Sequence, residues 1–471
     1  MELERLAIDG GTPVRSKPLP LEFPGVHYMG EEEITAVNRV LRARSPFRYY
    51  GVEFQGETAK FEEEFASFLE VRHALAVSSG TGALHTALSA LGAGPGQEII
   101  VPAYLWVSVA AAVVNHGAIP VAADIDDTFC LDPGAAERSI TQKTAGIILV
   151  HMSGAAADAD PIRRLADAHG LFLLEDCAQC AGGGVNGRKA GTFGDMAIFS
   201  FQMNKNMTAG EGGCVMTNDA RLHARAVACH DLGYARDASG RLIFDQPDLC
   251  LWGKGYRMDE LRAAVLRVQL QRLPQTTRAM RHSKYRIRRA LEAYPQARLR
   301  GIADPAGDTG AFLITTYRDR ETAHRVNAAL RAEGIVTESQ GVSNVLFTEW
   351  GLHLYYNIVS LAGRTSVDRA GFPWKLAENA GLARNYAKGA CPVADSLSNQ
   401  IGTEAPSIGI EVYPAQKRVP LSLSTCRPAL RCRGRRGCAR AARGGSRSST
   451  AGTPGVRRSL RGSPGRRGRS C

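Results

Sequence analysis

Residues 199–213 read FSFQMNKNMTAGEGG and place one lysine, Lys205, in a polar loop. An apolar run at 196–201 precedes the loop, and a second apolar run at 214–217 follows its glycines. Short apolar runs next to glycines are typical of buried strands. A lysine between buried strands is desolvated, which lowers the pKa of its ammonium group toward the range where the amine is nucleophilic. The stretch therefore suggests a Schiff-base lysine, and an ordinary loop lysine is the alternative.

The chain before this stretch alternates between apolar strands and helices. We expect strands at 98–101, 119–123, 144–150 and 171–174, with a helix at 161–169 between the last two. This βαβ order predicts an α/β fold, in which a mostly parallel sheet has helices on both faces. In such sheets, ligands bind beyond the carboxyl ends of the strands.

A glycine-containing turn follows another predicted strand, at 74–77. Its residues Ser79, Gly80 and Thr81 open a helix that continues to Leu91. The N-terminus of a helix exposes backbone N–H groups and a positive dipole end, which together can bind a phosphate group. The same three residues are also common in a routine helix cap, so the turn by itself is a weak signal.

An acidic residue, Asp176, stands at the end of the apolar run 171–174 and should be partly buried. A buried carboxylate requires a cationic or hydrogen-bonding partner, and a protonated pyridine nitrogen would serve. Enzymes that use pyridoxal phosphate need a lysine for covalent attachment, an acid for the pyridine nitrogen and an anion pocket for the phosphate. Lys205, Asp176 and the turn at Gly80 supply these three parts.

The chain divides by composition into four parts. Residues 1–30, which hold several prolines, predict an extended N-terminal arm, and residues 31–285 predict a large domain that binds the cofactor. Residues 286–397 predict a smaller α+β domain, which we expect to be incomplete because no regular pattern continues after it. Residues 398–471 predict an aberrant, arginine-rich and disordered tail.

The net charge of +12 comes from this tail. Residues 419–471 contain 14 arginines and no acidic residue, and the remaining 418 residues hold 44 basic against 46 acidic side chains. The body of the protein therefore offers no general attraction for nucleic acid. Residues 419–471 use only nine residue types, which suit GC-rich codons and favour a shifted reading frame over a basic arm for RNA.

Other signals in the sequence exclude several functions. Cys177 and Cys180 form a Cys-x-x-Cys pair, but no second pair at zinc-site spacing follows, so no metal is expected. The glycine-rich stretch at 92–96 follows a helix, whereas a dinucleotide fingerprint follows a strand. The chain has 11 cysteines, no visible secretory signal and no long apolar stretch, which predicts free thiols in the cytoplasm and no membrane span.

Several motifs occur together in this sequence. They are SSGTGAL at 78–84, VPAYLW at 101–106, EDCAQ at 175–179, GD at 194–195, SFQMNKN at 200–206, GEGG at 210–213 and YRMDEL at 256–261. With them the chain resembles the DegT/DnrJ/EryC1/StrS family of sugar aminotransferases over about residues 10–395. The resemblance implies the fold-type I architecture of pyridoxal phosphate transferases, in which a smaller α+β domain follows the large domain.

The resemblance also implies a role for individual residues. Lys205 would hold the cofactor and carry a proton between the substrate Cα and the cofactor, and Asp176 would pair with the pyridine nitrogen. Trp106 would stack on the ring, and Gln179 would lie near its phenolic oxygen. The phosphate would be bound by Gly80, Thr81 and Ser200. A core tryptophan and a strand-end serine are the alternatives for Trp106 and Ser200.

Two further residues are candidates for substrate contact. Tyr50 lies in a loop that resembles members of the family that aminate an eight-carbon keto-acid sugar, and His353 lies in a second stretch with the same resemblance. A histidine that is packed or exposed without a role is the alternative for His353. Gly255 stands where many relatives carry an asparagine that reaches the phosphate in the partner subunit, and Lys254 could replace it.

The family implies a homodimeric aminotransferase with a shared active site. The donor would be L-glutamate or L-glutamine, and the acceptor a nucleotide-linked keto-sugar, a keto-cyclitol or an eight-carbon keto-acid sugar, in antibiotic or cell-surface polysaccharide biosynthesis. Two alternatives remain. Dehydratases of the family usually replace the lysine with histidine, so Lys205 argues against them, and a non-catalytic protein would bind nucleic acid through the basic tail.

Overall fold

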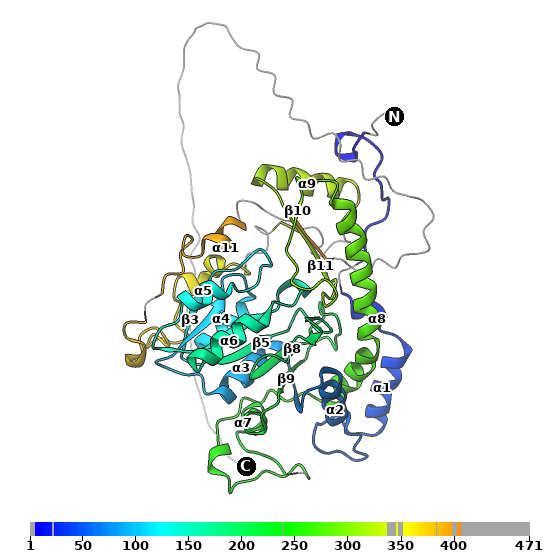
Figure 1. The fold of residues 1–471 in the computed structure, drawn as a ribbon. Coiled ribbons are helices and arrows are strands. Elements are labelled where there is room, and N and C mark those ends of the chain that lie inside the picture. The colour runs from blue at the N-terminus through cyan, green and yellow to red at the C-terminus, as the bar shows by residue number, and fades with distance from the viewer. Residues whose placement is uncertain are drawn as a thin grey trace, which may run out of the picture. The chain divides into compact units, whose positions relative to one another are not determined.

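The structure is a computed structural model of the 471-residue chain. It describes residues 5–20, 23–237, 239–336, 345–346, 352–382, 384–397 and 403–406. Figure 1 traces these residues from the N-terminal helices through a large sheet to a second, smaller sheet.

Seven described strands form the large sheet. Their bounds are β1 His73–Val77, β2 Glu98–Pro102, β3 Ile119–Ala123, β4 Thr144–Val150, β5 Phe172–Asp176, β8 Met196–Ser200 and β9 Gly213–Thr217. The spatial order is β1-β9-β8-β5-β4-β2-β3. The strands from β8 to β3 are parallel to their neighbours, and β9 is antiparallel to both β8 and β1. The predicted mostly parallel sheet is confirmed.

Helices flank this sheet. They are α1 Glu31–Arg42, α2 Glu57–Leu69, α3 Gly80–Leu91, α4 Val107–Asn115, α5 Pro133–Arg138, α6 Ala159–His169 and α7 Ala220–His230. The helix α3 is apolar on nearly all sides because it packs against α4, α7 and the strands β8 and β9. This packing fixes the N-terminus of α3 beside the end of β8.

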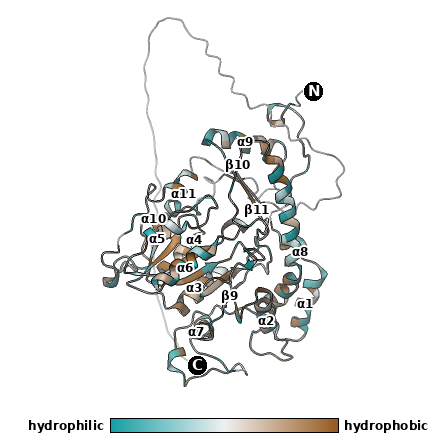
Figure 2. Cartoon of the chain, in the orientation of Figure 1, coloured by the Kyte–Doolittle hydropathy of each residue, from teal (hydrophilic) through white to brown (hydrophobic). Residues whose placement is uncertain are grey.

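Hydropathy separates the sheet from its surroundings. Figure 2 shows hydrophobic strands in the large sheet and mixed colours along the long outer helix, and every residue of β2, β8 and β9 is buried. Buried strands of a parallel sheet read as continuous apolar runs, which explains why the sequence marked them well. No helix among the described residues has the length and apolar character needed to cross a membrane.

One long helix, α8 at Glu260–Leu291, follows the large sheet. The sequence predicts two helices here, at 259–273 and 278–293, and that expectation is wrong. The helix continues through Pro274, although a proline inside a helix costs about 3 kcal/mol. Packing against α1 and α2 offsets this cost, and the Thr277 hydroxyl donates to the carbonyl of Leu273, 3.0 Å away, next to the interrupted turn.

A smaller antiparallel sheet lies beyond α8. Its strands are β10 Arg298–Leu299, β11 Phe312–Thr316, β12 Val345–Leu346 and β13 Thr403–Pro406, in the order β10-β11-β13-β12, and the helix α9 at Arg320–Ala332 follows β11. The strand β13 falls inside the range expected to be a disordered tail. It forms because β11 and β12 pair with it on both sides, which no local sequence pattern reports.

Residues 352–382 and 384–397, here named the C-terminal segment, contact the large sheet. The backbone N–H of Tyr355 donates a hydrogen bond to the carbonyl oxygen of Ala103, with 3.0 Å between nitrogen and oxygen. The carboxylate of Asp124, after β3, accepts N–H groups of the short helix α11 at Pro392–Leu397, with 2.9 Å to Ala394 N. The sequence grouped this segment with the small domain, whereas these contacts lie at the β2–β3 edge of the large sheet. The short helix α10, Val359–Ala362, belongs to the same segment.

The N-terminal arm connects the two sheets. The carboxylate of Glu333, after α9, accepts N–H groups of Ala7 and Val14 at 2.8 and 2.9 Å. Further along, Gly25 N–H donates to the backbone carbonyl of Lys205 over 3.2 Å. The arm therefore reaches the lysine loop itself. A short hairpin of β6 Gly184–Val185 and β7 Arg188–Lys189 completes the described strands.

Candidate active site

Lys205 lies in the loop that follows β8. Its backbone N–H donates to Gln202 O at 2.9 Å, and its carbonyl accepts the N–H of Gly25, so hydrogen bonds hold the backbone on both sides of Lys205. Burial lowers the pKa of the Lys205 ammonium group, and the negative charge of Asp176 partly opposes this shift. A desolvated lysine facing a carboxylate favours the Schiff-base interpretation over an ordinary loop lysine.

Asp176 ends β5 and is 4% exposed. Its Oδ1 accepts the N–H of Ala178 at 2.9 Å, the one hydrogen bond found for this carboxylate within the described part of the chain. Burial raises the pKa of the Asp176 carboxyl group, while the Ala178 N–H and the charge of Lys205 act in the opposite direction. A buried carboxylate with spare acceptor capacity fits a cationic partner such as a pyridinium nitrogen.

Gly80 and Ser200 form a cradle at the N-terminus of α3. A Cβ atom on Gly80 would lie 2.6 Å from Cβ of Ser200 and 2.9 Å from its hydroxyl oxygen. Glycine is therefore required for the helix terminus to approach the hydroxyl group this closely. Backbone N–H groups, the helix dipole and a hydroxyl donor are the features that bind phosphate.

The neighbouring side chains hold this cradle in place. Ser79 caps α3 by accepting the N–H of Gly82 at 2.9 Å. Thr81 Oγ1 donates to Ser108 Oγ at 3.1 Å, which links the start of α3 to the start of α4. The sequence analysis did not identify Ser108, because a serine in the first turn of a helix is a common residue without a motif of its own.

Trp106 stands at the N-cap of α4 and remains 44% exposed. Its ring lies 5.0 Å from the ring of His353, at an interplanar angle of 50°. His353 is only 7% exposed, and its carbonyl accepts the N–H of Leu105 at 2.9 Å. The indole therefore has one side supported and retains exposed surface that could stack on a cofactor ring. The burial of His353 favours a packing role over direct contact with substrate.

Gln179 follows Asp176 by three residues and is fixed by a backbone donor. Its side-chain oxygen Oε1 accepts the N–H of Ser153 at 2.8 Å. Because a backbone N–H can only donate, the amide end that faces Ser153 must be the oxygen. The NH2 group of Gln179 is left to donate elsewhere, as the predicted contact with a phenolic oxygen requires. Ser153 is a second residue that the sequence analysis missed.

Tyr50, a predicted substrate contact, lies at the surface. It is 68% exposed, and its ring packs on Phe47 with 4.7 Å between centroids. The loop is anchored by Arg48, which donates to the carbonyl of Ala76 at 3.1 Å. Among the described residues, Tyr50 makes no hydrogen bond to another candidate site residue.

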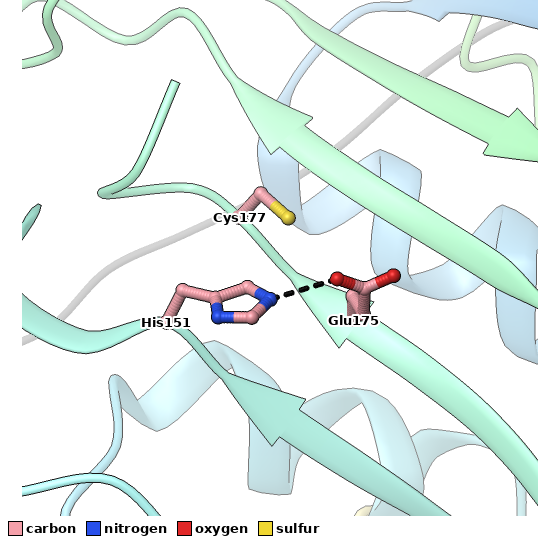
Figure 3. A group of neighbouring side chains, drawn as sticks. All are labelled: His151, Glu175 and Cys177. Atoms are coloured by element: carbon pink, nitrogen blue, oxygen red, sulfur yellow. Dashed lines mark hydrogen bonds and ion pairs between the residues drawn. The ribbon is translucent and has the colours of Figure 1, made fainter. Parts of the chain in front are cut away.

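Figure 3 shows a buried group beside this site, made of His151, Glu175 and Cys177. His151 Nε2 lies 2.8 Å from Glu175 Oε2, and its Nδ1 accepts the N–H of Ala157 at 3.0 Å, so Nε2 carries the proton. Glu175 also accepts three backbone N–H groups, from Gly191, Phe193 and Gly194. Donors thus occupy the lone pairs that a metal would need, and the group fixes the loop at 191–194.

Lys254 is turned toward its own chain. Its Nζ lies 2.9 Å from Nε2 of His116, whose Nδ1 lies 2.8 Å from the carbonyl of Ala112. The ammonium group of Lys254 therefore bonds to His116, although the sequence suggested that Lys254 could replace the missing asparagine. Gly255 has φ = +70°, a conformation that asparagine also tolerates better than most residues.

These residues fit pyridoxal phosphate. The cradle at Gly80 matches a phosphate, the buried acid Asp176 matches a ring nitrogen, and Trp106 and Gln179 match a ring face and a phenolic oxygen. Lys205 stands across from Asp176 with a pKa lowered by burial. The individual roles of these side chains stay predictions.

Comparison with known proteins supports this interpretation. A family model described as the DegT/DnrJ/EryC1/StrS aminotransferase family matches residues 27–342. L-glutamine:2-deoxy-scyllo-inosose aminotransferase of Streptomyces kanamyceticus is 40% identical over 299 residues, which cover 60% of this chain and 66% of that protein. GDP-perosamine synthase of Vibrio cholerae is 40% identical over 237 residues, which cover 50% of this chain and 63% of that protein.

A solved structure shares the fold. The crystal structure of 3-amino-5-hydroxybenzoic acid synthase superposes with a TM-score of 0.66 and 28% identity, covering 83% of this chain and 94% of that one. The large sheet and its flanking helices are thus those of an aminotransferase fold. The chain spans about two thirds of the length of the two curated relatives named above.

Proposed function

Because the chain belongs to the DegT/DnrJ/EryC1/StrS aminotransferase family, we propose that it is a pyridoxal phosphate-dependent aminotransferase. The observation that carries the proposal is the mutual charge effect of Lys205, in the loop after β8, and Asp176, at the end of the neighbouring parallel strand β5. The phosphate cradle of Gly80 and Ser200 lies at the end of β8. An ordinary loop lysine would need none of these partners.

The proposed chemistry assigns a task to each group. Bound pyridoxal phosphate supplies an electron sink that stabilises negative charge at the substrate Cα. Lys205 attaches the cofactor and, once released, moves the proton at Cα, a task that the lowered pKa of its amine suits. Asp176 keeps the ring nitrogen protonated, because its buried negative charge is otherwise stabilised by the Ala178 N–H and the charge of Lys205. Gly80, Thr81 and Ser200 hold the phosphate, and Trp106 covers the ring.

The substrates are proposed from the relatives. One relative carries L-glutamine and 2-deoxy-scyllo-inosose in its name, and another is a GDP-perosamine synthase. We propose L-glutamine as donor, with L-glutamate as the alternative, and a keto-cyclitol as acceptor, with a nucleotide-linked keto-sugar as the alternative. The dehydratase reaction is not favoured, since Lys205 is present.

A cytoplasmic homodimer with shared active sites completes the proposal. The seven described cysteines are free, as a reducing compartment allows. The loop that carries Tyr50 is exposed, and in this proposal Tyr50 contributes to the partner's active site. The division into an arm, a large domain to residue 285 and a small domain after it also stays a prediction.

Reduction of the purified protein with borohydride tests the proposal. The protein should be yellow with bound cofactor, and reduction should fix a pyridoxyl group on Lys205, located by peptide mass spectrometry. Keto-cyclitols and nucleotide-linked keto-sugars should then be tested with glutamine and glutamate as donors. A protein that stays colourless after incubation with pyridoxal phosphate, or a label on another lysine, contradicts the proposal.

A further inference from the structure

Arg300 is a buried cation just after β10. It is 3% exposed, and no carboxylate lies within ion-pair distance of it in the described part of the chain. Its guanidinium group instead donates to three backbone carbonyls: to Thr128 O at 2.6 Å, Met152 O at 2.8 Å and Ser153 O at 3.3 Å. Burying a charge without an ion-pair partner is costly, so the hydrogen bonds of Arg300 indicate that it holds these backbone segments in place.

Two of these carbonyls belong to the turn Met152–Gly154, which has a strained backbone. Ser153 adopts φ = +51°, a left-handed conformation that costs a non-glycine residue about 1–2 kcal/mol. Thr309 holds the same turn from the other side, since its N–H and its hydroxyl group both donate to Gly154 O, at 3.0 and 2.8 Å. Arg300 and Thr309 both lie between β10 and β11, two strands of the smaller sheet.

The strained turn also donates a hydrogen bond to the candidate site, from Ser153 N–H to Gln179 Oε1. This bond fixes the orientation of the Gln179 amide, which in the proposed function donates to the cofactor's phenolic oxygen. We propose that Arg300 is a positioning residue: it holds the Met152–Gly154 turn so that Gln179 presents its NH2 group to that oxygen. The inference rests on the proposed function and adds a residue that none of the motifs contains.

Arg300→Lys tests the inference, because lysine keeps the charge but loses the fork that spans two carbonyls. The measurement is the pH at which the visible absorption of the bound cofactor changes. Without the Gln179 donor, the phenolic oxygen carries more negative charge and holds the proton of the neighbouring Lys205–cofactor nitrogen more tightly. The midpoint should therefore rise by about 0.5–1 pH unit, the equivalent of one hydrogen bond. Cofactor affinity, from titration of the apoprotein, should fall several-fold.

Matched variants separate positioning from general damage. Arg298→Lys changes an exposed arginine on β10 and should leave the midpoint unchanged. Gln179→Ala should raise the midpoint, and the double variant with Arg300→Lys should raise it no further, because both changes remove the same contact. Thr309→Val loosens the turn while Arg300 stays in place, and it should give a smaller rise. It decides the case if Arg300→Lys does not fold.

Unchanged midpoints in Arg300→Lys and Thr309→Val overturn the inference, as does a double variant whose shift equals the sum of the single shifts. A wild-type chain that takes up no cofactor refutes the proposed function and the inference together. A wild type that takes it up, with variants that leave its midpoint in place, refutes the inference alone.

Discussion

Two regions of the molecule, the cofactor edge and the C-terminal segment, differ in how far local sequence pattern predicts their structure. The cofactor edge consists of the ends of β5 and β8 and the starts of α3 and α4. Its side chains follow strongly apolar strands, and β5 and β8 end within two residues of the expected positions. The C-terminal segment has no such strands, and its position depends on contacts with residues more than 200 positions away, such as the bond from Tyr355 N–H to Ala103 O. Local pattern therefore predicts a site at strand ends better than it predicts what covers the sheet.

The largest effect should follow removal of Lys205. Lys205→Ala takes away both the covalent attachment and the proton carrier, so transamination should fall by about a thousandfold or more. Borohydride labelling of the protein should also disappear. Far-UV circular dichroism serves as the control for folding. Transamination near the wild-type rate would show that the cofactor edge is not the active site.

Asp176→Asn keeps the size of the side chain and removes its charge. The ring nitrogen then loses its counter-charge, and breaking a buried ion pair by removing one partner costs about 3–5 kcal/mol. This loss falls on the transition state, so kcat should drop by about two-hundredfold to five-thousandfold. The effect should appear in kcat more than in KM. An unchanged kcat would separate Asp176 from the chemistry and leave it as a strand-end hydrogen-bonding residue.

Gly80→Ala tests the phosphate cradle. The added methyl group would meet Ser200 at 2.6 Å, so the helix terminus and the hydroxyl group must move apart. Cofactor affinity should fall by about tenfold or more, the equivalent of one or two hydrogen bonds to a charged group. Gly94→Ala is the matched control, since nothing lies within 4 Å of the added carbon there. Equal affinity in both variants would contradict the cradle.

The limits of sequence reasoning have physical causes. The strands and the motif residues could be predicted because buried parallel strands read as apolar runs and because the lysine loop has an unusual composition. The continuity of α8 through Pro274 could not be predicted, since α1 and α2 override the local preference. Arg300 and Ser153 could not be found either, because their roles come from hydrogen bonds between distant parts of the chain.

Tyr355→Phe probes how firmly the C-terminal segment is attached. The Tyr355 hydroxyl oxygen accepts the N–H groups of Ala390 and Cys391, each at 3.1 Å, and its proton is donated to Asp395 Oδ1 at 3.0 Å. The variant leaves the buried N–H of Cys391 without this acceptor, so the free energy of unfolding should fall by about 1–3 kcal/mol. Tyr50→Phe, on an exposed ring, should leave stability unchanged. Urea unfolding followed by fluorescence measures both.

If Tyr355→Phe is as stable as the wild type, the C-terminal segment is held by its other contacts. Cofactor affinity gives a second reading of the same variant. It should change little, because the Tyr355 hydroxyl group bonds to Cys391 and Asp395, whereas Trp106 contacts His353. A large loss of affinity with unchanged stability would mean that the segment belongs to the cofactor edge after all.

The smallest effect concerns acid stability, to which a histidine pair at α3 and α4 should contribute. His85 of α3 and His116 after α4 lie with 5.3 Å between their rings, and burial with the nearby charge of Lys254 lowers the pKa of each to about 4. In the unfolded chain a histidine has a pKa of about 6.5. Between these values the unfolded state binds more protons than the folded state, so stability should fall as the pH drops from about 6.5 to about 4.

His116→Gln should flatten this acid dependence, because one of the groups that take up a proton on unfolding is removed. The melting temperature of the variant and of the wild type is measured from pH 7 to pH 5 in roughly half-unit steps, and the two slopes against pH are compared. His282→Gln, at an exposed position on α8, should keep the wild-type slope. A slope unchanged by His116→Gln would place the acid sensitivity outside the α3–α4 pair. A flattened slope would show that proton uptake by His116 on unfolding contributes to the acid sensitivity of the protein.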